Sequence, residues 1–196
     1  MIKIGLTGTL GSGKTTVLGY FKKLGAAVVS CDGLVHHELA NNKVLQQKLR
    51  KIFGGDIFCG KQIQRSALAE RVFSSKKSLD QLSALVYPLV KKTLRVFFRK
   101  NAHRAVLVVE VPLLFEAGFD DLFDLTIGVA TDRKIQKQRL HKQGRLVAGD
   151  IARRLRWQLS LEEKISRCDL VIDNNGGKQK TFNQVKKIVE EKLWKN

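Results

Sequence analysis

Residues 8–15 read GTLGSGKT, and every position fits the pattern G-x-x-x-x-G-K-[ST]. Glycines let the backbone turn so that successive N–H groups point at one anion, and a helix that starts beyond them adds its positive dipole end. Lysine at position 14 supplies a cation for the β- and γ-phosphates, and the Thr15 hydroxyl is a hard oxygen ligand for Mg²⁺. We therefore expect a nucleoside triphosphate and Mg²⁺ here, against the alternative of a chance glycine-rich turn. The residues expected to hold the nucleotide are Gly8, Leu10, Gly11, Ser12, Gly13, Lys14, Thr15 and Thr16.

The segments on either side of this loop have the pattern that such a loop requires. Residues 2–7 form a short apolar run typical of a strand, and residues 14–24 have helical character and end at Gly25. Residues 26–30 predict a second strand. The order strand, loop, helix, strand is a βαβ unit.

Further along the chain, strands and helices continue to alternate. Strands are expected at 105–111, 125–130 and 170–172, and helices at 132–143, 151–159 and 180–195. Between the second and third strands, residues 33–100 are mostly helical, which is longer than an ordinary crossover. The pattern predicts one α/β domain with a doubly wound parallel sheet. Its core is expected at 1–32, 101–131 and 165–196, with a helical insertion at about 33–100.

The composition argues against a disordered protein and against a membrane-spanning one. Hydrophobic residues make up 43% of the chain and charged residues 28%, which excludes disorder as the main state. The most apolar stretch, residues 105–115, is interrupted by Glu110 and Pro112 and is shorter than the roughly 20 residues that a membrane span needs. Three cysteines without close spacing favour free thiols, and the N-terminus resembles neither a signal nor a transit peptide. We expect a cytoplasmic protein.

Several polar residues follow the predicted strands, where ligands bind in open parallel sheets. Asp32 is a candidate base for an alcohol that accepts a phosphoryl group, or else a helix N-cap. Glu110 is a candidate Mg²⁺ ligand through water, or a strand-end salt-bridge partner. Glu116 is expected to hold a base or ribose edge, or to cap a helix. Asn174 follows the last strand and is expected beside the nucleotide.

The charge is strongly positive and unevenly distributed. The chain has 36 Lys and Arg against 18 Asp and Glu, a formal net charge of +18, and such a field attracts phosphorylated ligands or nucleic acid. Residues 133–156 hold nine Lys and Arg against one acid. We expect a mobile lid over the phosphates at about 132–164, with Arg139 and Arg154 as the arginines that reach them, unless this is a solvated basic face.

The sequence resembles the dephospho-CoA kinase family over essentially its whole length. The run IGLTGTLGSGKTT at 4–16 is similar to the family's opening, and VPLLFE at 111–116 is its most distinctive internal run. The C-terminal pattern of the family is matched in order by Gln136, Arg139, Arg154, Leu155, Gln158, Glu163, Lys164, Asp169, Val171, Ile172, Asn174 and Gly176.

The resemblance implies transfer of phosphate from ATP to the 3′-hydroxyl of the dephospho-CoA ribose. It implies that the insertion binds CoA, that Asp32 is the base and that Arg139 is the lid arginine. Substrate contacts are expected at Tyr87, Pro112, Leu113 and Glu116. The chain departs from the family at Ser30-Cys31-Asp32, where Asp-Ala-Asp is usual, at Tyr87-Pro88, where His-Pro is usual, and at Gln143, where a second lid arginine is usual.

Two other functions remain open from the residues alone. A nucleoside or nucleoside-monophosphate kinase would use the same loop and sheet. A nucleic-acid-binding protein with a phosphate loop would account for the charge, although the sequence lacks a recognisable nucleic-acid module.

Overall fold

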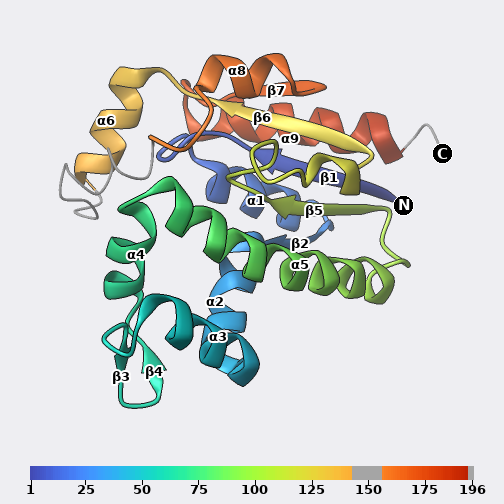
Figure 1. Ribbon diagram of the computed structural model, residues 1–196. Coiled ribbons are helices and arrows are strands. Elements are labelled where there is room, and N and C mark those ends of the chain that lie inside the picture. Colours follow the sequence, from blue (N-terminus) through green and yellow to red (C-terminus); the bar gives the residue numbers. More distant parts are fainter. Residues whose placement is uncertain (143–155, 194–196) are drawn as a thin grey trace. The chain divides into compact units, whose positions relative to one another are not determined.

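The computed structural model describes residues 1–142 and 156–193. The chain divides into two compact units (Figure 1). The first unit comprises Met1–Cys31 and Phe97–Asn196, and the second comprises Asp32–Val96. The bounds of the second unit lie close to those of the expected insertion.

The first unit is built on a parallel sheet of five strands in the order β2-β5-β1-β6-β7. Leu6 of β1 and Ser30 of β2 both pair with Glu110 of β5, and Ala130 of β6 pairs with Asp173 of β7. The carboxyl ends of the strands therefore lie at one edge of the sheet. This topology confirms the predicted doubly wound α/β fold. The strands are β1 (Ile2–Thr7), β2 (Ala27–Ser30), β5 (Val106–Glu110), β6 (Leu125–Ala130) and β7 (Leu170–Asp173).

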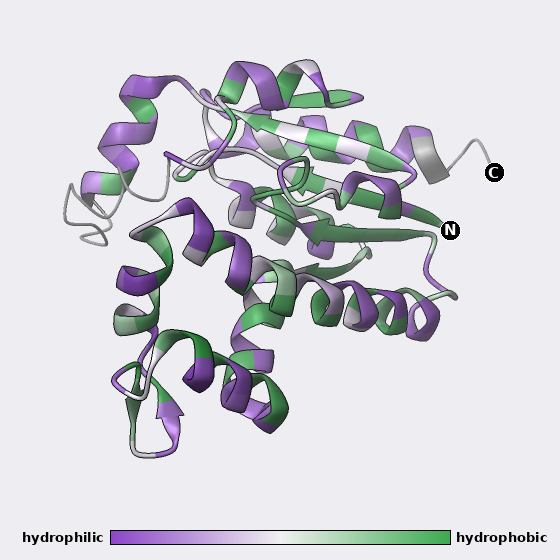
Figure 2. Ribbon diagram, viewed as in Figure 1, coloured by the Kyte–Doolittle hydropathy of each residue, from purple (hydrophilic) through white to green (hydrophobic). Residues whose placement is uncertain are grey.

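Apolar side chains explain why these strands form one core. Every residue of β5 is buried. Its first four residues are valine and leucine, a run that is typical of a strand covered on both faces, and the strand is coloured as hydrophobic in Figure 2. On one face, α1 (Lys14–Lys23) and α9 (Lys178–Leu193) complete a core cluster with the strands, and Tyr20 meets Phe182 edge to face at 5.4 Å. On the other face, Phe123 packs over Gly5, where a Cβ would come within 2.8 Å of its ring.

The second unit is mainly helical. It contains α2 (Cys31–Asn41) from its second residue, α3 (Lys43–Phe53), α4 (Arg65–Phe73) and most of α5 (Lys76–Lys100). Asn42 caps α3, since its side chain accepts a hydrogen bond from the Leu45 amide at 3.0 Å. The buried residues that hold this unit together are Leu39, Leu45, Leu49, Phe53, Ile57, Leu68, Val72, Val86, Val90 and Leu94.

This unit also contains a short hairpin, which was not predicted within the mostly helical stretch. Strands β3 (Phe58–Cys59) and β4 (Gln62–Ile63) pair antiparallel, with Cys59 opposite Gln62. Gly60 has φ +60° in the two-residue turn between them, a conformation that glycine adopts without strain. Strands of two residues are too short to leave an alternating hydrophobic pattern, so sequence periodicity misses them.

In the C-terminal part of the chain, two of the three predicted helices are present and the third is not found where the chain is described. Helix α6 (Arg133–Lys142) and α9 lie where helices were predicted. Of the helix expected at 151–159, the first five residues lie outside the described residues, and residues 156–159 are turn and coil, so the prediction is wrong there. The next helix, α8 (Leu161–Ser166), begins just beyond this stretch, with a capping box between Ser160 and Glu163 at its start. Earlier in the chain, a 3₁₀ helix, η1, spans Asp120–Leu122. Within residues 1–142 and 156–193, no helix combines the length and the apolar character that crossing a membrane requires.

Candidate active site

The loop between β1 and α1 has the backbone conformation that its glycines predict. Gly8, Gly11 and Gly13 all have positive φ, at 149°, 80° and 92°. A Cβ on Gly13 would lie 2.2 Å from Asn174 Nδ2, and one on Gly8 would lie 2.8 Å from the Val129 carbonyl oxygen. Glycine is required at these two positions both by the turn and by the close approach of neighbouring groups.

Lys14 lies inside the loop. Its Nζ donates hydrogen bonds to the carbonyl oxygens of Gly8 at 3.0 Å and Thr9 at 2.9 Å, and only 7% of the residue is exposed. The ammonium group is thus held at the loop by its own backbone. Phosphate oxygens are stronger partners for it than neutral carbonyls, so an arriving triphosphate can take over these bonds.

Thr15 and Glu110 meet at the carboxyl edge of the sheet. Thr15 Oγ1 lies 3.3 Å from Glu110 Oε1 and 3.5 Å from Oε2, and Glu110 is the last residue of β5. Glu110 is buried, whereas Thr15 is exposed in the first turn of α1. A hydroxyl and a carboxylate at this distance are the hard oxygen donors that Mg²⁺ prefers, so this pair fits a magnesium ion shared with phosphates.

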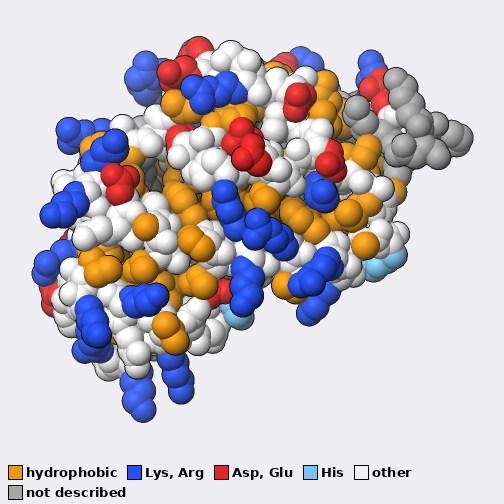
Figure 3. Space-filling view, turned by 45° about the vertical axis from the view of Figure 1, so that its right-hand side comes forward, with side chains coloured by type: hydrophobic (Ala, Val, Ile, Leu, Met, Phe, Trp, Pro, Cys, Tyr) orange, Lys and Arg blue, Asp and Glu red, His pale blue; other side chains and the backbone are white. Residues whose placement is uncertain are grey.

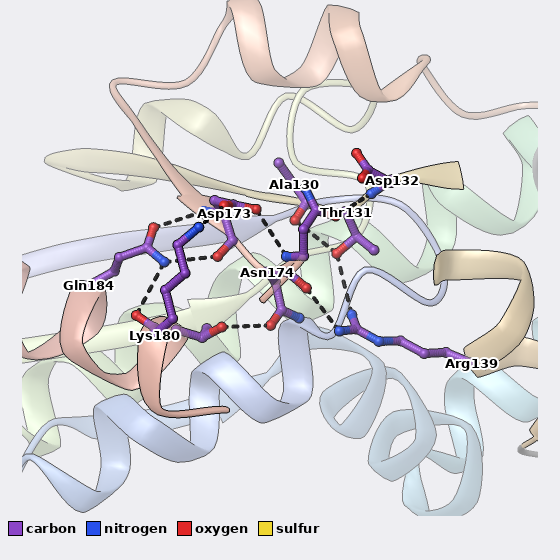
Figure 4. A network of polar contacts seen from close by, with 10 residues as sticks. Ala130, Thr131, Asp132, Arg139, Asp173, Asn174, Lys180 and Gln184 are labelled. Atoms are coloured by element: carbon purple, nitrogen blue, oxygen red, sulfur yellow. Dashed lines mark hydrogen bonds and ion pairs between the residues drawn. The ribbon is translucent and has the colours of Figure 1, made fainter. Parts of the chain in front are cut away.

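The carbonyl oxygen of Ser12 is the centre of a hydrogen-bond network that joins three segments of the first unit. It accepts from Thr131 Oγ1 at 2.9 Å, from Asn174 Nδ2 at 2.7 Å and from Arg139 Nη1 at 3.3 Å. Arg139 Nη2 also donates to the Asn174 carbonyl at 2.8 Å, reaching from α6 toward the end of β7 (Figure 4). The network fixes the peptide next to Gly13, and it places Arg139 and Asn174 at the phosphate loop.

Helix α6 contacts the phosphate loop through a second residue. Gln136 Nε2 donates to Thr9 Oγ1 at 3.1 Å and to the Leu10 carbonyl oxygen. Gln136 and Arg139 are both half-buried, while the basic residues Arg133, Lys134 and Lys137 of the same helix are exposed. The face of α6 that meets the loop is therefore the face that carries Gln136 and Arg139.

Basic side chains also occur away from this loop. Lysine and arginine side chains are spread over the visible face of the molecule (Figure 3). Among the expected lid residues, Arg154 and Gln143 lie outside the described residues. The two ends of the basic block are described: Arg139 lies at the loop, and Arg156 lies over the Trp157 ring at 5.2 Å.

Residues 112–116 follow β5 and form a turn beside the sheet edge. The Val111 amide donates to the Leu6 carbonyl at 2.8 Å, and Pro112 O lies 3.5 Å from Thr7 Oγ1. Glu116 Oε1 accepts from the Leu159 amide at 2.9 Å and pairs with Lys164 Nζ at 2.9 Å. Glu116 therefore contacts the residue before the N-cap of α8, and it is not itself a helix cap.

The remaining expected site residues belong to the second unit. Asp32 is its first residue and lies exposed in the first turn of α2, two residues after Ser30. It is inside the helix, so the alternative of an N-cap is wrong. Burial and the charge of Arg65 lower the pKa of His36 on the same helix, and the charge of Asp32 only partly opposes this shift. Tyr87 is half-buried on α5, directly before Pro88.

Sequence reasoning did not foresee the burial of Lys164, which it named only as part of the family pattern, and it missed Thr181. Lys164 is fully buried, although its neighbours Glu162 and Glu163 give it the appearance of a solvated helix face. Thr181 donates to Asn174 Oδ1 at 2.9 Å and orients that amide. The role of Lys164 has no local signal, because its partners Pro112 and Glu116 lie about 50 residues earlier. Thr181, in contrast, lies only seven residues from Asn174 but acts on it across the end of β7.

Known proteins resemble this chain over nearly its full length. A model of the dephospho-CoA kinase family matches residues 2–180. The dephospho-CoA kinase of Bacillus licheniformis is 36% identical over 197 residues, covering 98% of this chain and 96% of that protein, and the one of Syntrophotalea carbinolica is 35% identical over 188 residues, covering 94% and 89%. A crystal structure from Thermus thermophilus superposes with a TM-score of 0.83 at 29% identity, covering 97% of both chains. The loop, its partner residues and these similarities together show that the chain belongs to the dephospho-CoA kinase family.

Proposed function

We propose that this protein transfers the γ-phosphoryl group of ATP to the 3′-hydroxyl of the dephospho-CoA ribose, giving coenzyme A and ADP. The observation that carries the proposal is the complete phosphate loop, with Lys14 inside it and Thr15 against Glu110, in a chain of this family. A nucleoside or nucleoside-monophosphate kinase is not favoured, because the family match extends over residues 2–180 and not over the loop alone.

The donor is held by the loop and by the start of α1. Backbone amides along the loop bind its phosphates, and Lys14 exchanges the Gly8 and Thr9 carbonyls for phosphate oxygens. Asn174 lies where it can border the nucleotide, since its side chain contacts the loop peptide at Ser12. The residues proposed for donor binding are Gly8, Leu10, Gly11, Ser12, Gly13, Lys14, Thr15, Thr16 and Asn174.

Mg²⁺ would be held by Thr15, with Glu110 acting directly or through water. When bound, the ion neutralises negative charge on the phosphate oxygens. Glu110 contributes by keeping a carboxylate buried next to the Thr15 hydroxyl, which it orients at 3.3 Å.

The roles proposed on the acceptor side follow the family resemblance. Asp32 accepts the proton of the attacking hydroxyl and aligns its oxygen. Tyr87, Pro112, Leu113 and Glu116 contact the acceptor, and the unit Asp32–Val96 provides the rest of its binding surface. Arg139 stabilises the transferred phosphoryl group after releasing the Asn174 carbonyl, because a charged oxygen is a stronger partner for a guanidinium than a neutral one.

Turnover by the purified protein tests the proposal. ADP release should rise on addition of dephospho-CoA, and the product should be coenzyme A by mass and by chromatography. Nucleosides, nucleoside monophosphates and duplex or single-stranded nucleic acid serve as the comparison panel. An absence of stimulation by dephospho-CoA, or a preference for a nucleoside, would reject the acceptor.

Replacing Glu110 by glutamine should weaken the response to Mg²⁺. Loss of the carboxylate charge beside Thr15 should raise the Mg²⁺ concentration for half-maximal activity by about 10- to 100-fold. ATP affinity measured without metal should stay unchanged. The matched control is Glu190→Gln on the exposed face of α9, whose Mg²⁺ dependence should equal that of the original chain. An unaltered Mg²⁺ dependence in Glu110→Gln would remove this residue from the metal site.

A further inference from the structure

Lys164 of the first unit is completely buried. Lys164 of α8 is 0% exposed, and its Nζ donates to the Pro112 carbonyl oxygen and to Glu116 Oε1, the latter at 2.9 Å. A buried ion pair is costly to desolvate, and apolar residues of similar size often stabilise a protein as well or better. Stability alone therefore gives a weak reason for a charge at this place.

Both acceptors of this ammonium lie in the turn 112–116. This segment belongs to no strand or helix. Backbone hydrogen bonds from Ala117 to Leu113 at 3.0 Å and from Phe119 to Leu114 at 2.9 Å hold its middle, whereas its two ends depend on individual contacts. Lys164 joins Pro112 to Glu116, the two ends of the turn. Each end has one other hydrogen bond among the described residues: Thr7 Oγ1 donates to the Pro112 carbonyl at 3.5 Å, and the Leu159 amide donates to Glu116 at 2.9 Å.

Lys164 can impose a shape on the turn because its own helix is fixed. The Ser160–Glu163 capping box closes the N-terminal end of α8. Helix α8 approaches β6 closely at Gly128, where a Cβ would lie 3.2 Å from Cys168 Sγ and 3.5 Å from Ile165 Cγ1. Just beyond the helix, Asp169 Oδ2 accepts from the Thr126 amide at 2.7 Å and from Thr126 Oγ1 at 2.6 Å. These contacts fix the backbone that carries Lys164 against β6.

One carboxylate oxygen of Glu116 accepts no hydrogen bond from the described residues. Oε1 receives both of its hydrogen bonds, while Oε2 is buried and accepts from no residue in the described part of the chain. A carboxylate held by one oxygen can accept a further hydrogen bond from a hydroxyl or an amino group through the other.

We propose that Lys164 is a positioning residue for the acceptor substrate: by holding the Pro112 carbonyl and Glu116 Oε1, it sets the turn 112–116 in the shape that binds the acceptor and directs Glu116 Oε2 to an O–H or N–H group of its nucleoside part. This inference rests on the proposed function, in which Pro112, Leu113 and Glu116 contact dephospho-CoA. It adds a residue that does not touch the acceptor itself.

The test compares the KM values of the two substrates in Lys164→Met, which keeps an unbranched apolar chain but no charge. The KM for dephospho-CoA should rise about tenfold or more, while the KM for ATP and kcat should change less than about threefold. Lys187→Met is the matched control, because it removes an exposed ion pair with Glu191 on α9 and should leave both KM values unchanged. A folded Lys164→Met protein with the original KM for dephospho-CoA would overturn the proposal.

Two further variants separate positioning from general support of the fold. Glu116→Gln keeps the shape and the Oε1 acceptor, and it should also raise the KM for dephospho-CoA without affecting that for ATP. The double variant Lys164→Met/Glu116→Gln should be no worse than Lys164→Met, because one residue acts through the other. Additive effects would overturn the proposal, and if Lys164→Met does not fold, an unchanged KM in Glu116→Gln would do so.

The outcome also distinguishes this inference from the proposed function. If the original chain converts dephospho-CoA and the variants retain its KM, only the positioning role fails. If the original chain shows no ADP release that depends on dephospho-CoA, the proposed function fails, and the inference fails with it.

Discussion

Replacing Asp32 by asparagine should lower kcat by roughly 10²- to 10⁴-fold, the usual contribution of a positioned general base. The KM for ATP should stay within about twofold of its original value. The amide keeps the size of the side chain but can neither take the proton of the acceptor hydroxyl nor attract it. Asp32 is exposed in the first turn of α2, so removal of its charge should leave the fold intact.

A matched variant separates the base from a general effect of charge. Asp80→Asn makes the same chemical change at an exposed position of α5 in the same unit, and its kcat should be unchanged. Steady-state kinetics with dephospho-CoA and ATP varied in turn would measure both variants. Full activity of Asp32→Asn would exclude Asp32 from the mechanism and leave the proton to solvent or to phosphate.

Replacing Gly13 by alanine should nearly abolish ATP binding. The backbone at Gly13 has φ +92°, and the added methyl group would lie 2.2 Å from Asn174 Nδ2. Asn174 would have to leave the Ser12 carbonyl, to which it donates at 2.7 Å, and the loop amides would lose their common direction. We expect an ATP Kd at least ~100-fold higher, together with a loss of roughly 1–3 kcal/mol in the free energy of unfolding from backbone strain.

Gly19→Ala provides the control for this change. Gly19 lies in α1, and a Cβ there would meet nothing within 4 Å. The same substitution should therefore stabilise the protein by about 0.5–1 kcal/mol and leave ATP affinity unchanged. Calorimetric titration with ATP and thermal unfolding would measure both variants. Original ATP affinity in Gly13→Ala would contradict the role given to the loop backbone.

The order of the strands along the chain was predictable because each strand carries a local signal. Mostly apolar runs such as Val106–Glu110 and Leu125–Ala130 are typical of buried parallel strands, and the structure has them within one residue of the expected bounds or at the same bounds. The hairpin at Phe58–Ile63 and helix α8 were missed for the opposite reason. Both elements are too short for a hydrophobic period, and turn geometry or capping determines them.

Some residues of the candidate site could likewise be predicted from a local pattern, and others could not. The chemistry of Lys14 and Thr15 follows from their place in a contiguous motif, so spacing alone assigns it. The structure brings Glu110 to Thr15 and Asn174 and Arg139 to Ser12, which are contacts between segments about 95 to 162 residues apart. These contacts form only because particular strands are neighbours in the sheet. The local sequence of a single segment does not determine that strand order.

Local interactions within about a dozen residues thus account for what could be foreseen here: the phosphate loop, the alternation of strands and helices, and the class of ligand. Long-range packing accounts for the rest. Lys164 illustrates the difference, because its charge suggests solvent while the fold gives it 0% exposure and two partners near β5, about 50 residues earlier. Burial is a property of the assembled sheet and its covering helices, so a lysine's environment is decided only when distant segments have packed around it.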